Sequence, residues 1–295
     1  GSDTVRFAGN MGDFTFEVAA DGTLMVTDTG SGNSLGVDTI SGVETLSFAD
    51  GDLTVTTTAD GDVTLTGSSV DDVITVTGSV GATLDGVSGI DTLTGGSGDD
   101  VLDGRAGNDV IEGGAGVDSI TGGAGVDHIK GGDGNDIIIV ADDASFKVSG
   151  GVETVDGGAG TDTLSFTENA ALTLTAPELG ELVGVEKIAL AGASAQSLTF
   201  GNATFDDLGN TSLTITTTTG DSTTSIDGSA VSNGSFLIID DGSNTNTDTL
   251  IGGSGDDIFR FSSTTGLTSD DSVKGNGGTD TIPVSYTHLT LPTKA

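Results

Sequence analysis

The chain has 295 residues, of which 50 are glycine, and its 45 Asp and Glu against 8 Lys and Arg give a formal net charge of −37. So acidic a chain does not suit the recognition of nucleic acid, which needs Lys and Arg for the phosphates, nor docking on an anionic membrane surface. No apolar run reaches the roughly 20 residues that a membrane helix needs, so we expect no membrane span.

The rest of the composition indicates a repetitive β protein. Aromatic residues make up only 4 % of the chain, and the 34 % apolar residues occur as short β-branched runs such as 73–76 and 137–140, which favour strands. The chain has no Cys, which excludes disulfides and zinc–thiolate sites. Residues 1–10 show no charged-then-apolar leader, so we expect no signal peptide of that kind.

Residues 1–85 form the first β-rich segment. Phe14–Val18 alternates apolar and polar residues, Asp21-Gly22 suits a tight turn, and Leu24–Val26 returns, which predicts a hairpin. Residues 67–75 (GSSVDDVIT) match the repeat described next, but Val70 stands where Gly is expected. We therefore expect this segment to form a degenerate coil.

Residues 86–140 hold an internal repeat, which is the feature to look for first in such a chain. Position 1 is Gly, position 4 is Gly, position 6 is Asp and position 8 is Leu or Ile in all six unbroken copies; position 2 departs from Gly at Val87 and Arg105. The copies read GVSGIDTLT (86–94), GGSGDDVLD (95–103), GRAGNDVIE (104–112), GGAGVDSIT (113–121), GGAGVDHIK (122–130) and GGDGNDIII (131–139).

The spacing predicts a coil built from two copies. Positions 1–6 form a turn, where Gly supplies positive φ, and positions 7–9 form a strand whose middle residue points inward. Turns of the same kind then recur every 18 residues, stacked about 4.8 Å apart. The inward residues are Leu93, Leu102, Ile111, Ile120, Ile129 and Ile138.

The position-6 aspartates fall into two columns in this arrangement, Asp91, Asp109 and Asp127 on one edge and Asp100, Asp118 and Asp136 on the other. Stacked carboxylates repel one another unless a cation lies between them. Two carboxylates and the carbonyl oxygens of the Gly turns make an all-oxygen site that suits Ca²⁺ better than Mg²⁺ or a transition metal. We expect about four such sites, one for each pair 18 residues apart.

These copies resemble the RTX family of hemolysin-type calcium-binding nonapeptide repeats. The resemblance implies an all-β fold, a parallel β-roll or β-solenoid with flanking β-rich segments and with Ca²⁺ in the turns. It also implies a bacterial protein exported by type I secretion to the extracellular space or cell surface, unfolded at low calcium and folded outside the cell.

The remaining segments carry isolated copies of the repeat. Residues 141–250 are rich in Thr and Ser that alternate with aliphatic residues, which predicts strands with one polar face, and 251–282 form a second, short RTX-like block. Asp162, Asp257 and Asp280 occupy position 6 of copies without a partner 18 residues away. They are either half sites for calcium or plain turn residues.

Residues 283–295 resemble a translated sequencing adapter, so we exclude them from fold reasoning.

Catalysis is not expected in this chain, so we assign no catalytic residue. Residues 32–36 match a G-x-S-x-G elbow, but the one His outside the adapter-like tail, His128, lies in a repeat strand, and a serine nucleophile needs a nearby base. We expect a calcium-folded structural module of a secreted surface protein, an adhesin or S-layer-like protein, with a cell-surface or matrix partner. The alternative is the C-terminal folding module of a secreted RTX hydrolase, a protease or lipase whose catalytic domain lies upstream.

Overall fold

The computed structural model describes two compact units. Unit 1 is Gly1–Thr167 with Glu181–Val185, and unit 2 is Glu168–Gly180 with Glu186–Ala295. The residues described are 2–30, 36–58, 62–140, 154–167, 171–175, 179, 182–190, 195–202, 212–217, 223–232, 234–240, 247–261 and 269–283. The adapter-like residues 284–295 and residues 32–35 of the G-x-S-x-G match lie outside them.

Unit 1 begins with antiparallel strands that cover one end of its β-roll. The predicted hairpin is confirmed, since β2 (Phe14–Val18) pairs antiparallel with β3 (Leu24–Asp28), and β3 pairs in the same way with β4 (Val37–Ile40). A second antiparallel meander follows, formed by β5 (Thr45–Ser47), β6 (Asp52–Thr57) and β7 (Val63–Thr66). The first strand, β1 (Thr4–Arg6), pairs parallel with β5. A short 3-10 helix, η1 (Met11–Asp13), precedes β2. Phe7, Phe14, Phe16 and Phe48 pack together here, with ring centroids 5.0–6.1 Å apart.

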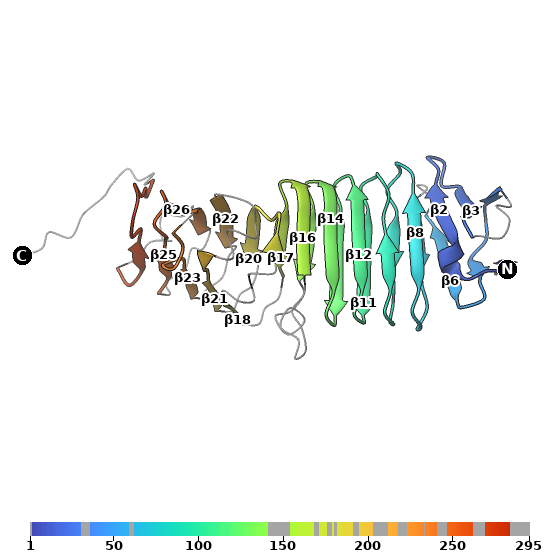
Figure 1. The fold of residues 1–295 in the computed structure, drawn as a ribbon, viewed down its shortest axis with the longest axis horizontal. Helices are drawn as coiled ribbons and strands as arrows, with labels where there is room; N and C mark the ends of the chain where they lie inside the picture. Colours follow the sequence, from blue (N-terminus) through green and yellow to red (C-terminus); the bar gives the residue numbers. More distant parts are fainter. Residues whose placement is uncertain are drawn as a thin grey trace, which may run out of the picture. The chain divides into compact units, whose positions relative to one another are not determined.

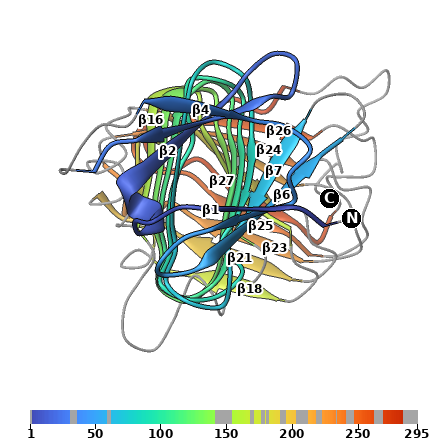
Figure 2. The same cartoon turned by 90° about the vertical axis from the view of Figure 1, so that its right-hand side faces the viewer.

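The parallel coils of unit 1 follow this antiparallel region. In one sheet β7 is followed by β9 (Thr83–Asp85), β11 (Val101–Ala106), β13 (Ser119–Ala124), β15 (Ile137–Val140) and β17 (Thr163–Phe166). In the other, β2 is followed by β8 (Val73–Thr77), β10 (Thr92–Thr94), β12 (Val110–Ala115), β14 (His128–Gly134), β16 (Thr154–Gly160) and β19 (Leu182–Val183). Figure 1 shows β8, β12, β14 and β16 side by side, and Figure 2 looks along the stack, with β16 on one side and β7 on the other.

The predicted register is confirmed across residues 86–139. Val101 pairs with Ser119, and Val110 pairs with His128, in each case 18 residues away. Strand β10 has the three residues predicted, whereas β11 to β14 are longer, because residues at positions 1–3 of the following copy also pair, as Arg105 does with Gly123. The inward residues of position 8 are 0–3 % exposed and form the core.

Glycine is needed in the turns because neighbouring coils approach closely. A Cβ built on Gly125, at position 4, would meet the carbonyl oxygen of Gly107 in the coil before it, and one on Gly123, at position 2, would meet that of Arg105. Both glycines also have positive φ, +147° and +107°, which side chains penalise.

Unit 2 has two parallel sheets of its own. One contains β20 (Lys187–Leu190), β22 (Ser212–Thr217), β24 (Ser235–Asp240) and β26 (Ile258–Phe261). The other contains β18 (Leu172–Leu174), β21 (Gln196–Thr199), β23 (Thr224–Asp227), β25 (Thr249–Ile251) and β27 (Ser272–Lys274). In β22 Leu213 and Ile215 are buried while Thr214 and Thr216 lie on the other face, as the alternation of Thr and aliphatic residues predicts. The all-β fold with parallel coils is therefore confirmed.

Candidate metal centres in the turns

The position-6 aspartates of the repeat are buried. The side chains of Asp91, Asp100, Asp109, Asp118, Asp127 and Asp136 are 0–1 % exposed. Charged side chains are seldom buried to this degree without a partner. Each aspartate therefore needs compensation from the turn in which it lies.

One oxygen of each carboxylate is used by the backbone of the neighbouring coil. Oδ1 of Asp109 accepts a hydrogen bond of 2.8 Å from the main-chain N–H of Asp91, 18 residues earlier. The same bond joins the pairs Asp109–Asp127, Asp100–Asp118 and Asp118–Asp136 at 2.8–2.9 Å. The two predicted columns are thus present, and their members are adjacent in space.

The other oxygen, Oδ2, has no hydrogen-bond partner in five of these turns. The five aspartates are Asp91, Asp109, Asp118, Asp127 and Asp136. A buried carboxylate oxygen without a donor costs the full desolvation of the group, on the order of 1–3 kcal/mol or more. A cation bound beside these oxygens would compensate five such atoms at the same position of five repeats.

A carbonyl oxygen of the next coil lies close to the position-1 glycine in the turns of Asp91, Asp109, Asp118 and Asp136. A Cβ built on Gly104, at position 1, would meet Oδ2 of Asp109 and would lie 2.7 Å from the carbonyl oxygen of Gly122 in the next coil. Gly113 is flanked in the same way by Asp118 Oδ2 and by the Gly131 carbonyl oxygen. Position 1 is therefore glycine because a side chain would fill a space between two oxygen atoms.

The electrostatics of these carboxylates also indicate a missing positive charge. The pKa of Asp91, Asp109 and Asp118 is raised from 3.8 to about 6, first of all by burial and also by neighbouring carboxylates, against the lowering effect of the backbone hydrogen bond. Burial likewise raises the pKa of Asp100, Asp127 and Asp136. In the absence of a cation, the fold disfavours the charged form of these aspartates.

The donor set fits a calcium ion. Among the residues that the structure describes, no group of three or more His, Cys, Asp or Glu side chains gathers closely enough to hold a metal, so the carboxylates need backbone carbonyl oxygens to complete a site. Hard oxygen donors from backbone and carboxylate, six to eight in number, are what Ca²⁺ takes. The candidate donors are Oδ2 of the five aspartates named above and the carbonyl oxygens of the position-1 glycines in the next coil.

The isolated copies are not isolated in space. Asp162 lies 26 residues after Asp136, yet its Oδ1 accepts the N–H of Asp136 at 2.7 Å, and Oδ1 of Asp280 accepts the N–H of Asp257 at 3.1 Å. These aspartates have no partner 18 residues away, but each is stacked on an aspartate at a longer separation, because extra residues lie between the coils. Asp162 and Asp257 are fully buried, whereas Asp280 is exposed.

Several residues that take part in the stacking were missed from the sequence. Asp72 of the degenerate copy donates its N–H to Oδ1 of Asp91, and Asp248, which is 1 % exposed, accepts the N–H of Thr224. A ladder also runs through position 5, where Asp or Asn accepts the N–H of the residue stacked on it: Asp71 from Ile90, Asp99 from Val117, Asn108 from Val126, Asn135 from Thr161 and Asp256 from Thr279. The sequence does contain a signal for this ladder, since each of these Asp or Asn residues stands directly before a position-6 aspartate.

Arg105 points away from the aspartate columns. Its guanidinium forms ion pairs of 3.0 Å with Asp85 and with Asp103, which are partners across β9 and β11. It therefore offsets one of the two negative charges that Asp85 and Asp103 place at the ends of neighbouring strands. On the other sheet His128 is exposed and contacts Thr154, consistent with a solvent-facing side chain.

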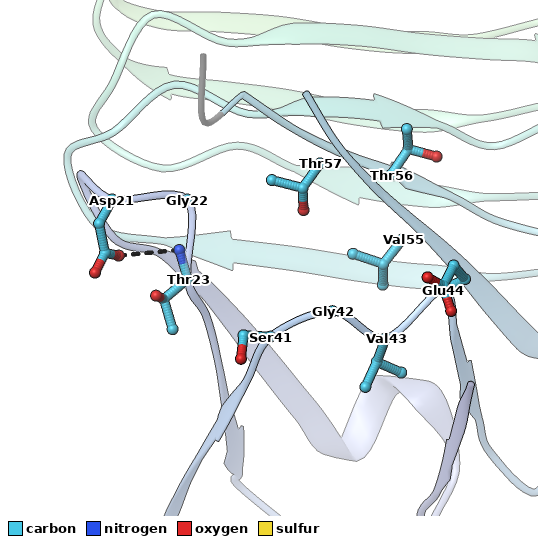
Figure 3. A pocket seen from close by; sticks show the side chains of 10 residues that line it. All are labelled: Asp21, Gly22, Thr23, Ser41, Gly42, Val43, Glu44, Val55, Thr56 and Thr57. Atoms are coloured by element: carbon cyan, nitrogen blue, oxygen red, sulfur yellow. Dashed lines mark hydrogen bonds between the residues drawn. The ribbon is translucent and has the colours of Figure 1, made fainter. Parts of the chain in front are cut away.

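A cavity of about 410 Å³ lies in the antiparallel region of unit 1 (Figure 3). Asp21 and Glu44 are among the residues that line it. Both carboxylates bind nearby amides, Asp21 that of Thr23 at 3.0 Å and Glu44 that of Asp3 at 2.7 Å. We assign no role to this cavity.

Comparison with known families agrees with the geometry. A family model described as RTX calcium-binding nonapeptide repeat (4 copies) matches residues 85–120, 112–144, 149–165, 243–261 and 265–282. The chain carries RTX calcium-binding repeats. Calcium is accordingly the ion of this chain, and the matching family is a structural repeat and not a catalytic one. No curated protein matches the sequence.

The RTX repeats make this chain a calcium-binding structural module of the kind found in secreted proteins. Within the described residues no helix combines the length and apolar character needed to cross a bilayer.

Proposed function

We propose that this chain is a calcium-folded structural module of a secreted bacterial surface protein, adhesin or S-layer-like, exported by type I secretion. The observation that carries the proposal is the set of five buried Oδ2 atoms without a hydrogen-bond donor, at Asp91, Asp109, Asp118, Asp127 and Asp136. Bound calcium supplies the positive charge that these carboxylates lack.

The aspartate columns couple ion binding to folding. Aspartates that are stacked in the folded chain are 18 residues apart in sequence, and in the unfolded chain nothing holds them together as a site. An ion that binds only the folded state therefore stabilises it. A chain with 45 acidic residues and 8 basic ones repels itself in the compact state. Low calcium then favours an extended chain, and the calcium concentrations outside cells favour the folded one.

What supports a surface module over a hydrolase appendage is the presence of parallel strands in unit 2 as well. In β22 Thr214 and Thr216 lie on the outer face while Leu213 and Ile215 are buried, and in β23 Ser225 lies outward while Ile226 is buried, so these strands have a polar face. The gene sequence upstream discriminates the two: an adhesin predicts further β-repeats, and a hydrolase predicts a catalytic domain with its own nucleophile or zinc motif.

Equilibrium dialysis of the full chain against Ca²⁺, with Mg²⁺ as the matched ion, tests the calcium function. We expect several Ca²⁺ ions to bind per chain and Mg²⁺ at the same concentration to displace few of them, since Mg²⁺ demands a tighter octahedral shell and holds its water. Binding of no Ca²⁺, or equal binding of both ions, would contradict the proposal.

A further inference from the structure

The turns occur in two forms, which differ in how Oδ2 of the position-6 aspartate is satisfied. In three turns, which we call closed, the N–H of the residue at position 2 donates to it: Ser68 to Asp72 at 2.6 Å, Gly96 to Asp100 at 2.8 Å and Gly253 to Asp257 at 2.9 Å. In the turns that we call open, those of Asp91, Asp109, Asp118, Asp127 and Asp136, Oδ2 is buried and has no partner.

The backbone at position 2 separates the two forms. Every open turn has positive φ there, namely Val87 (+76°), Arg105 (+71°), Gly114 (+116°), Gly123 (+107°) and Gly132 (+121°). No closed turn does, since Ser68, Gly96 and Gly253 are all outside the left-handed region. The value of φ at position 2 sets the direction of its N–H, so the same sequence pattern either turns this donor toward its own aspartate or away from it.

The closed turns stand first in their columns. The coil before Asp100 places Ala82, and the coil before Asp257 places Phe236, where later coils have an aspartate; their amides donate to Oδ1 at 2.7 Å. Asp72 in turn precedes Asp91, to whose Oδ1 its amide donates at 2.9 Å. The columns of Asp72 and Asp100 therefore start with an aspartate whose own turn satisfies Oδ2, and they continue with aspartates whose Oδ2 is buried without a partner. Asp257 is followed by Asp280, which is exposed.

We propose that the closed turns are calcium-independent first turns, and that calcium is held by the open turns that follow. The reason is electrostatic. In the closed turns of Asp100 and Asp257 an amide hydrogen already compensates each carboxylate oxygen, and in that of Asp72 the amide and hydroxyl of Ser68 do so. In an open turn a single amide does. The inference rests on the proposed calcium function. It separates Asp100 and Asp257 from the other predicted ligands. It also gives the columns of Asp72 and Asp100 a first turn that folds without an ion and on which the next coil stacks.

Asp100 and Asp118 form a matched pair for the test. They are consecutive in one column, both are 1 % exposed, and Oδ1 of each accepts an amide at 2.7 or 2.8 Å. They differ at Oδ2: that of Asp100 accepts a hydrogen bond from the Gly96 amide, and that of Asp118 has no donor. Asn in either place keeps the Oδ1 acceptor and replaces Oδ2 with an NH₂ group, which cannot accept.

The experiment counts Ca²⁺ ions bound per chain by equilibrium dialysis and measures the thermal midpoint in chelator for wild type, Asp100→Asn and Asp118→Asn. We expect Asp118→Asn to bind at least one ion fewer, with no fall in the chelator midpoint, because it removes an uncompensated buried charge. We expect Asp100→Asn to bind the wild-type number of ions and to melt earlier in chelator, because the Gly96 amide loses its acceptor.

Loss of as many ions from Asp100→Asn as from Asp118→Asn overturns the inference. The ion count decides even if the chelated chain is unfolded, and Asp257→Asn repeats the closed-turn arm in unit 2 should Asp100→Asn not fold. A wild-type chain that binds no Ca²⁺ is a different result, which removes the proposed function itself.

Discussion

Oδ1 of Asp136 accepts a hydrogen bond of 2.9 Å from the main-chain amide of Asp118, so a side chain of one RTX coil holds the backbone of the coil before it. Oδ2 of the same Asp136 is buried without a partner. One oxygen of this carboxylate thus joins two coils by a hydrogen bond, and the other is free to bind a cation. This division predicts how the chain responds to mutation, to pH and to calcium.

Asp118→Ala removes both functions of an open-turn aspartate. The Asp100 amide loses its acceptor, at a cost of about 1–3 kcal/mol, and the calcium concentration at the folding midpoint rises about tenfold or more. Circular dichroism during a calcium titration measures this midpoint. Asp133→Ala, an exposed carboxylate of the same roll, is the control and leaves the midpoint within about twofold; equal shifts for the two variants contradict the assignment.

The calcium-free chain is expected to become more stable in mild acid. The folded-state pKa of Asp91, Asp109 and Asp118 is raised from 3.8 to about 6, first of all by burial, so the folded chain takes up protons that the unfolded chain does not. This contribution is complete below pH 3.8 and is lost as the pH rises through 6. Thermal melts in chelator from pH 7 to pH 5 check it, and a midpoint that falls over this range would speak against it.

With calcium present, the same carboxylates predict the opposite trend. Protons compete with the ion below pH 6, so the calcium midpoint rises as the pH falls from 7 to 5. Titrations at fixed ionic strength measure it. A calcium midpoint that does not depend on pH would show that these carboxylates are not the ligands.

Val87 holds a left-handed backbone conformation that suits glycine. Its φ is +76° and its side chain is 38 % exposed, so Val87→Gly removes strain of about 1–2 kcal/mol and little packing. We expect a gain of about 1 kcal/mol in the free energy of unfolding in calcium, by urea denaturation. Val110→Gly, at an exposed strand position of β12, should lower the free energy of unfolding by about that amount. A lower free energy of unfolding in both variants would contradict the claim that Val87 is strained.

The position-5 ladder needs an acceptor and not a charge. Oδ1 of Asp99 accepts the amide of Val117 at 2.8 Å, and Asp99 is exposed. Asp99→Asn keeps this acceptor, so stability and the number of bound calcium ions should not change. Asp99→Ala should lose about 1 kcal/mol. A lost ion in Asp99→Asn would instead make Asp99 a ligand.

The sequence was sufficient for residues 86–139 because there the coil length is constant. Eighteen residues per coil fix which strands pair, so the inward position of Ile120 and the adjacency of Asp100 and Asp118 follow from counting. The same counting fails at Asp162, where 26 residues separate stacked aspartates. Residues inserted between coils leave the three-dimensional register intact and remove the period from the sequence.

Two other features, the antiparallel meander and the two forms of turn, could not be predicted from the local sequence. The antiparallel meander β5–β6–β7 has no repeat, and its Phe48 packs on aromatic rings far along the chain. The open and closed turns share one sequence pattern, since Gly96 and Gly114 are both glycine at position 2 and differ in φ. That difference depends on place in the column, which only the stacked coils define.

The most direct test of the calcium-coupled roll is calorimetric unfolding of the full chain over a series of free calcium concentrations. Because ions that bind only the folded state stabilise it by mass action, the midpoint should rise continuously with the logarithm of calcium concentration, with a slope that corresponds to several ions. A midpoint that is the same in excess chelator and in millimolar calcium would contradict the account.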